Sequence, residues 1–191
     1  EAALQVEPND SLAHVGLGNL HKERGLLGRA IDAFARATEL DPDLWQAHYN
    51  LGGALYAEAR DRDYRSSDDL VQRAVYHLVT ALRLQPFESF LSNIYKDLGE
   101  LFLHAREYTY ARRFFNRLID DPDCGGIANY YLGLTHYSMG RYTGAIHHYQ
   151  EFLKSEPDSA LAYSKMALAY LELGQWDEAR NTCDKALALD P

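Results

Sequence analysis

The side chains best suited to chemistry in this sequence are eight histidines and two cysteines. His147 and His148 are adjacent, so on a helix they point in different directions, whereas a two-histidine metal site needs i,i+4 spacing. Cys124 and Cys183 are far apart and belong to no CxxC pair and no zinc-type run. Four further histidines recur at two positions that aromatic packing residues could fill, namely His14, His48, His21 and His136. The sequence therefore predicts no metal site and no cofactor.

Catalytic patterns are also missing from the sequence. It contains neither HExxH nor GxSxG, and its carboxylates are scattered rather than paired. Gly125 and Gly126 lack the GxxxxGK[ST] frame of a phosphate loop, so we predict a turn there. We therefore expect a chain that is not an enzyme.

The net charge of the chain and the length of its apolar runs limit the classes of partner that it can bind. The formal net charge is −9 and the pI is near 5.3, whereas nucleic-acid binding needs clustered Lys and Arg. No apolar run reaches the roughly 20 residues of a membrane-spanning helix. We therefore expect no nucleic-acid partner and no membrane insertion. The sequence assigns no compartment, and a cytoplasmic location is only the default expectation.

The elements that must position any binding site follow a repeat. Successive prolines lie 34, 44, 36, 35 and 34 residues apart, a period typical of helix–turn–helix repeats. A large residue followed by glycine or alanine recurs once per repeat, and an alanine follows at a fixed distance in the second half. These small residues predict the points where two helices cross closely. They are Gly18, Gly52, Gly99, Gly133 and Ala167 in first helices, and Ala30, Ala74, Ala111, Ala145 and Ala179 in second helices.

This pattern resembles the tetratricopeptide-repeat (TPR) family across essentially the whole chain. The resemblance implies an all-α fold, a right-handed superhelical solenoid of about five helix–turn–helix repeats. The predicted parts are a helix tail at 1–7, TPR 1 at 8–42, TPR 2 at 43–86 with a charged insertion at about 60–69, TPR 3 at 87–122, TPR 4 at 123–157 and TPR 5 at 158–191. Near the start of TPR 3, Phe87, Phe90 and Leu91 have helical spacing, and we expect them to pack rather than to form an exposed patch.

In this family the first helices line a concave groove, so the resemblance implies a partner-binding face on recurring first-helix positions. Tyrosine offers rigid contact area with a polar tip, and asparagine can bond a partner's backbone. The predicted contact residues are Asn19, Tyr49, Asn50, Tyr56, Lys96, Tyr130, Tyr131, Leu134, Tyr137 and Lys165. Some of the tyrosines could instead fill gaps between repeats.

Some TPR proteins grip a chaperone's C-terminal carboxylate with a Lys/Asn/Asn/Lys/Arg set. Asn19 and Asn50 match that set, but Val15, Asn93 and Asp97 stand where the three basic residues would be. The first function hypothesis is therefore a scaffold that binds a peptide or protein partner of another kind. The alternatives are a homo-oligomeric assembly module that self-associates through uncapped repeat ends, and a regulatory TPR region of a larger enzyme such as a glycosyltransferase.

Overall fold

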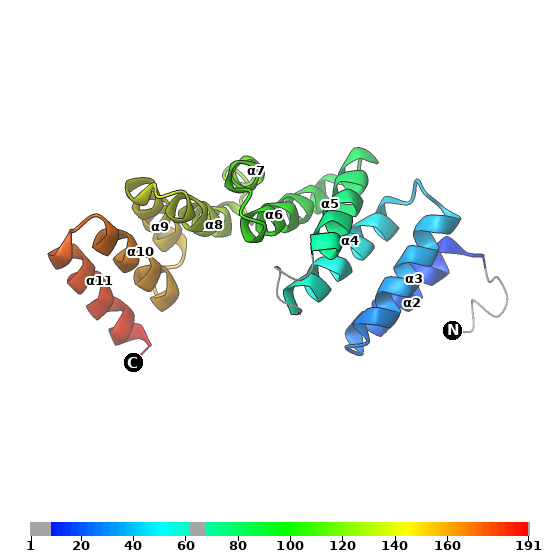
Figure 1. The fold of residues 1–191 in the computed structure, drawn as a ribbon, viewed down its shortest axis with the longest axis horizontal. Coiled ribbons are helices and arrows are strands. Elements are labelled where there is room, and N and C mark those ends of the chain that lie inside the picture. Colours follow the sequence, from blue (N-terminus) through cyan, green and yellow to red (C-terminus); the bar gives the residue numbers. More distant parts are fainter. Residues whose placement is uncertain (1–8, 62–67, 191) are drawn as a thin grey trace. The chain divides into compact units, whose positions relative to one another are not determined.

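The computed structural model describes residues 9–61 and 68–190, and over those ranges the chain forms ten α-helices and no strand (Figure 1). The helices are α2 (Ser11–Glu23), α3 (Leu27–Leu40), α4 (Trp45–Asp61), α5 (Asp68–Arg83), α6 (Glu88–His104), α7 (Tyr108–Phe115), α8 (Gly125–Ser138), α9 (Tyr142–Ser155), α10 (Ala160–Glu172) and α11 (Trp176–Leu189). The prediction of an all-α solenoid of helix pairs is confirmed. The predicted tail at 1–7 and the centre of the insertion, 62–67, lie outside the described residues.

The helices form two compact units, unit 1 at Glu1–Leu101 and unit 2 at Phe102–Pro191, with the division inside α6. In unit 1, α2 packs on α3, α3 on α4, and α4 on α5. In unit 2, α7 packs on α8, α8 on α9, α9 on α10, and α10 on α11. We call α2, α4, α6, α8 and α10 the first helices, because each opens a helix pair.

Local sequence explains where these helices begin and turn. Asp10 caps α2, because its Oδ1 accepts hydrogen bonds from the backbone N–H of Leu12 at 2.9 Å and of Ala13 at 3.2 Å. The turn inside three pairs needs a left-handed backbone, which glycine adopts without a Cβ clash. Gly25, Gly140 and Gly174 supply it, with φ near +70°. Arg106 holds the equivalent place after α6 with φ of 61°.

Small residues let the paired helices approach closely, as the sequence predicts. A Cβ added to Gly18 would collide with the ring of Phe34, and one added to Gly133 would collide with the ring of Tyr149. A Cβ on Gly52 would lie 2.7 Å from Leu78 Cγ. The five predicted second-helix alanines, Ala30, Ala74, Ala111, Ala145 and Ala179, are all buried. The predicted close crossings are therefore confirmed at these positions.

Candidate functional site

All ten residues predicted to contact a partner lie on first helices. Asn19 is exposed on α2, Tyr56 is buried on α4, and the other eight are half-buried: Tyr49 and Asn50 on α4, Lys96 on α6, Tyr130, Tyr131, Leu134 and Tyr137 on α8, and Lys165 on α10. The structure thus divides the predicted set between the two units. Five members lie in unit 1, on α2, α4 and α6, and the other five lie in unit 2, on α8 and α10.

In unit 1, polar side chains of α4 and α6 meet. The Tyr56 hydroxyl on α4 donates a hydrogen bond to Glu100 Oε2 on α6 at 3.0 Å. Only 8% of Tyr56 is exposed, so this tyrosine joins the two helices and offers little surface to a partner. Tyr49, two turns earlier on α4, faces Asp97 closely enough that burial and the Asp97 charge raise the pKa of its hydroxyl to about 12.

Asp97 is the most perturbed carboxyl group of this cluster. Burial raises its pKa to about 6, and the Glu100 charge adds to the increase. Lys96 and Lys22 lower the pKa but do not restore its ordinary value. Asp97 is therefore a half-buried carboxylate whose charge its surroundings compensate poorly, which is a feature of binding and functional sites.

Aromatic side chains continue this cluster toward the start of α6. Phe90 lies 4.8 Å from Trp45 and 6.2 Å from Tyr49 between ring centroids, and Phe87 lies 6.1 Å from Trp45. Phe87 is 70% exposed and Phe90 is 37% exposed. Phe87 and Phe90 therefore pack against other rings, as expected, but the expectation that they leave no exposed patch is wrong. Phe87 directly precedes α6 and Phe90 lies in its first turn.

In unit 2, two of the predicted tyrosines pack against aromatic rings of neighbouring helices. The Tyr131 ring stacks on Phe115 at 5.0 Å, and the Tyr130 ring lies 5.3 Å from Phe152 and 6.2 Å from Tyr149. Burial raises the pKa of Tyr130. These two tyrosines join α8 to α7 and α9, so their removal would loosen unit 2 as well as change its surface.

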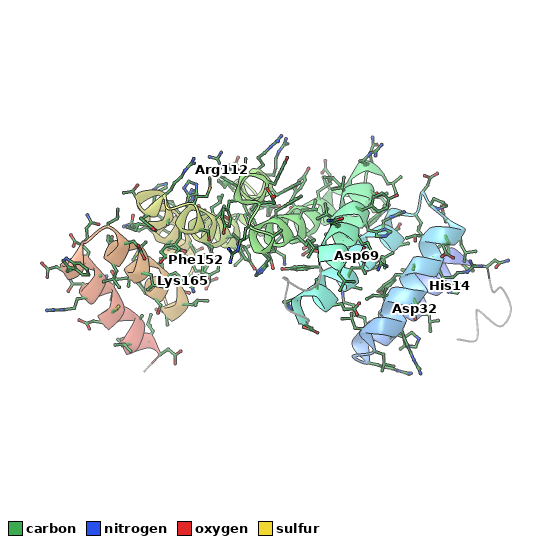
Figure 2. The ribbon with its side chains drawn as sticks, viewed as in Figure 1. His14, Asp32, Asp69, Arg112, Phe152 and Lys165 are labelled. Carbon is green, nitrogen blue, oxygen red and sulfur yellow. The ribbon has the colours of Figure 1, made fainter. Side chains whose placement is uncertain are left out.

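A strip of side chains on α8 and α10, apolar or aromatic except for Ser164, remains partly exposed. The strip consists of residues 34 positions apart in the two helices, and we call it the unit 2 strip: Ile127, Tyr130, Leu134 and Tyr137 on α8, and Leu161, Ser164, Leu168 and Leu171 on α10. Leu161 is 57% exposed and Leu168 is 43% exposed. Figure 2 labels Lys165 on α10 and Phe152 on α9 in this unit. The Tyr137 hydroxyl donates a long hydrogen bond of 3.5 Å to Glu172 on α10.

Two histidine pairs hold first helices to second helices. His48 Nε2 lies 3.1 Å from the Pro42 carbonyl, which can only accept, so Nε2 carries the proton. His48 Nδ1 then accepts from His77 Nδ1, 2.9 Å away on α5. Burial lowers the pKa of both rings, that of His77 to about 4. The sequence placed His48 at a packing position but left His77 without a partner.

The second pair lies in unit 2. His148 Nδ1 on α9 donates to Asn129 Oδ1 on α8 at 2.9 Å, and the His148 ring lies 5.0 Å from His136. Burial and the nearby His136 and His147 lower the pKa of His148 to about 4. His77 and His148 each follow a buried alanine by three positions, and this recurrence is the signal that could have revealed both pairs.

Acid should destabilise the chain through these pairs. The pKa of a histidine in the unfolded chain is near 6.5, whereas the pKa of His77 and that of His148 in the folded chain are about 4. Between these values each unfolded ring binds more protons than the folded one, so the stability that these two rings contribute is highest above pH 6.5. It falls as the pH drops toward 4, by at most ~1.4 kcal/mol per pH unit for each ring and less with partial exposure. Urea unfolding at pH 7, 6 and 5 measures this slope. Replacing both rings by glutamine should flatten it, whereas His147→Gln should not. An unchanged slope in the double variant would contradict the assignment.

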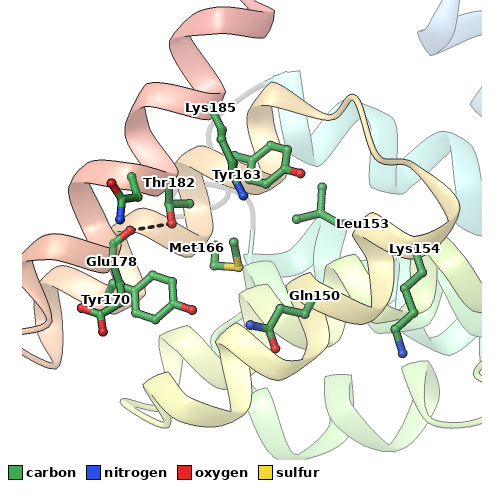
Figure 3. A pocket seen from close by; sticks show the side chains of 10 residues that line it. Gln150, Leu153, Lys154, Tyr163, Met166, Tyr170, Glu178, Thr182 and Lys185 are labelled. Atoms are coloured by element: carbon green, nitrogen blue, oxygen red, sulfur yellow. Dashed lines mark hydrogen bonds between the residues drawn. The ribbon is translucent and has the colours of Figure 1, made fainter.

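A pocket of about 380 Å³ lies elsewhere on unit 2, among α9, α10 and α11 (Figure 3). The Lys185 ammonium lies 5.7 Å from the centroid of the Tyr163 ring. The Thr182 hydroxyl donates to the Glu178 carbonyl at 2.6 Å, and Lys154 pairs with Glu151 at 2.7 Å. Thr182, Lys154 and Lys185 are thus engaged in contacts within the chain, and the sequence did not predict this pocket.

The described residues also bear on metal sites and membrane-spanning helices. In residues 9–61 and 68–190, no three His, Cys, Asp or Glu side chains gather in a way that could hold a metal ion. Over the same residues, no helix combines the length and the apolar character needed to cross a bilayer.

Comparisons with known proteins agree with the repeat and the helix pairs. Sequence models described as "TPR repeat" and "Tetratricopeptide repeat" match residues 18–58 and 130–191, together more than half of the chain. Superkiller protein 3 of Schizosaccharomyces pombe is 24% identical over 97% of this chain, and Hsp70-Hsp90 organizing protein 3 of Arabidopsis thaliana is 24% identical over 95%. The chain spans only 15% and 37% of the lengths of these two relatives.

Similar folds have also been solved. The crystal structure of YrrB, described as a TPR protein with an unusual peptide-binding site, superposes with a TM-score of 0.80. It is 18% identical, and the match covers all of this chain and 91% of YrrB. Repeat spacing, paired helices with small residues at their crossings, and these matches agree: the chain belongs to the tetratricopeptide-repeat family.

Proposed function

We propose that this chain is a non-catalytic interaction module that binds a peptide or protein segment on its first helices. The observation that carries the proposal is the unit 2 strip, where apolar side chains recur in the same register on α8 and α10. Ile127, Leu161, Leu168 and Leu171 are each at least 36% exposed. Exposed apolar side chains that gather on one surface mark interaction sites in folded proteins, and we propose that these four side chains serve that purpose.

Two further points support a peptide as the partner. The strip alternates large apolar groups with the tyrosine tips of Tyr130 and Tyr137, which suits side-chain contact combined with backbone hydrogen bonding. YrrB, a protein with the same fold, is described as having a peptide-binding site. A C-terminal carboxylate is a poor ligand for unit 1, because Asp97 would repel it from a position where such a site needs a cation.

The test uses peptides selected from a random 12-residue phage library on the whole chain. We expect affinities of roughly micromolar. Leu168→Glu should weaken binding at least about tenfold, because it places a charge in the apolar contact. Trp176→Ala is the matched control, since Trp176 is 68% exposed but lies on a second helix, α11. Circular dichroism checks that helix content is unchanged. Equal affinity of the Leu168→Glu variant and the parent chain would contradict the proposal.

A second candidate, self-association, is favoured by a groove of about 470 Å³ between α10 and α11. Leu161, Leu168 and Leu187 line it, and Leu187 is 61% exposed. If this groove binds a second copy, the mass from light scattering rises with concentration, and Leu187→Asp abolishes the rise. Leu187 lies on α11, outside the unit 2 strip, but it lines the same groove as Leu161 and Leu168 of the strip, so the mass from light scattering, and not peptide affinity, is the measurement that tests this candidate. A constant monomer mass would remove this candidate.

A further inference from the structure

We propose that unit 1 recognises a basic side chain, arginine or lysine, carried by an otherwise apolar segment of the partner. The site is the α4–α6 face, which we define as Trp45, Tyr49, Phe87, Phe90, Asp97 and Glu100. This inference rests on the proposed function, because it names the chemistry of the segment that one unit of the interaction module binds.

The aromatic rings of the α4–α6 face contact one another, but part of their surface is exposed to solvent. Trp45 contacts both Phe87 and Phe90 at the distances given above, and Tyr49 contacts Phe90. These four rings support one another, yet Phe87 leaves 70% of its surface in solvent. Exposed rings held in fixed positions offer a rigid surface for the aliphatic stem of a long side chain and for a cation over a ring face.

The acidic half lies directly next to the rings. Phe90 and Asp97 are seven residues apart on α6 and therefore share one side of that helix. Trp45 and Tyr49 are one turn apart on α4 and likewise share a side. Tyr49 connects the two halves. Its ring contacts Phe90, and the charge of Asp97 contributes to the raised pKa of its hydroxyl. Glu100 extends the acidic half, anchored by the hydroxyl of Tyr56 at 3.0 Å.

Charge complementarity decides the occupant. The charged groups that act on Asp97 are Glu100 and Lys96 on α6 and Lys22 on α2. The two lysines do not offset the burial of Asp97, so the carboxylate gains from a further cation that approaches from the exposed side. Arginine fits best, because its planar guanidinium can stack on a ring and donate two hydrogen bonds to a carboxylate. The net charge of −9 favours encounter with such a segment.

The experiment starts from peptides selected on the whole chain from the 12-residue library. We expect arginine or lysine beside large apolar residues to be enriched. A selected arginine peptide is then compared with a copy in which citrulline, which is neutral and similar in shape, replaces arginine. Titrations use a Trp176→Phe background, because the chain has only two tryptophans and Trp45 then reports locally by fluorescence.

The citrulline copy should bind about tenfold more weakly. Asp97→Asn should reduce the affinity for the arginine peptide by about the same factor while leaving that for the citrulline copy nearly unchanged. Phe87→Ala should weaken both peptides about fivefold. The matched controls are Tyr76→Ala, a 63% exposed aromatic on α5, and Asp32→Asn, an exposed acid on α3, and both should stay within twofold.

The outcomes separate this inference from the proposed function. If selected peptides bind and depend on Leu168, but lack basic residues or bind equally well as citrulline copies, the inference is overturned and the proposed function stands. Arginine peptides that bind with no effect of Asp97→Asn and Phe87→Ala also overturn it, because the cation then sits elsewhere. If no peptide binds the whole chain, both proposals fail.

Discussion

Replacing Gly18 by valine is expected to lower the free energy of unfolding by about 2–3 kcal/mol. A Cβ at this position would collide with the ring of Phe34, which is fully buried and cannot swing into solvent. Relief therefore requires α2 and α3 to move apart, which opens gaps in the packing of unit 1. Urea unfolding followed by circular dichroism measures the loss.

The control substitution lies two residues away on the same helix. A Cβ at Gly16 would meet nothing within 4 Å, and Gly16 is exposed. Gly16→Ala should therefore raise stability by up to ~1 kcal/mol, because alanine favours the helix and glycine does not. Similar effects of the two substitutions would show that Gly18 is not a contact point between the helices.

Replacing Asp97 by asparagine is expected to stabilise the chain by about 1–2 kcal/mol at pH 7.5. The pKa of Asp97 is raised to about 6, so between pH 3.8 and 6 the folded chain binds more protons than the unfolded chain. Stability contributed by this group therefore falls as the pH rises through that window and stays low above pH 6. Asparagine removes the cost because it carries no charge to desolvate.

The gain should disappear as the pH falls toward 4, where the Asp97 carboxyl group is already neutral. Thermal unfolding at pH 7.5 and at pH 4.5 measures the free energy of unfolding at each pH. The control Asp32→Asn should change neither free energy by more than ~0.5 kcal/mol. A loss of stability in the Asp97→Asn variant at pH 7.5 would mean that a cation within the chain already compensates this carboxylate. Stabilisation combined with weaker binding of basic peptides would show that Asp97 is kept for binding rather than for folding.

Much of the fold follows from residue size and spacing alone. Glycine and alanine at a fixed interval leave room for two helices to cross, and the larger residue that follows each alanine fills the space beside the crossing. Gly18 with Phe34 and Gly133 with Tyr149 show this rule at work. Helix pairs of this kind depend on contacts close in sequence, so a local pattern carries enough information to predict them.

The candidate site was only partly accessible from the sequence. The first-helix positions of Tyr49, Lys96 and Leu134 follow from the repeat register, but their exposure does not. Tyr56 has the same register in its helix as Tyr137 has in α8, yet the first is buried and the second is half-buried. Both hydroxyls donate to a glutamate of the next first helix, Tyr56 to Glu100 at 3.0 Å and Tyr137 to Glu172 at 3.5 Å, so the difference in exposure follows neither from the register nor from the presence of a partner.

The sequence by itself therefore determined the class of fold, the helix pairs and the helices that carry the proposed binding surface, because these depend on periodicity and on side-chain volume at crossings. Only the tertiary structure decided that Phe87 and Phe90 keep exposed surface beside Trp45, that His48 meets His77, and that Asp97 lies half-buried beside Tyr49. Each of these depends on whether a neighbouring helix covers a given side chain. That coverage varies from repeat to repeat even where the residue pattern is the same.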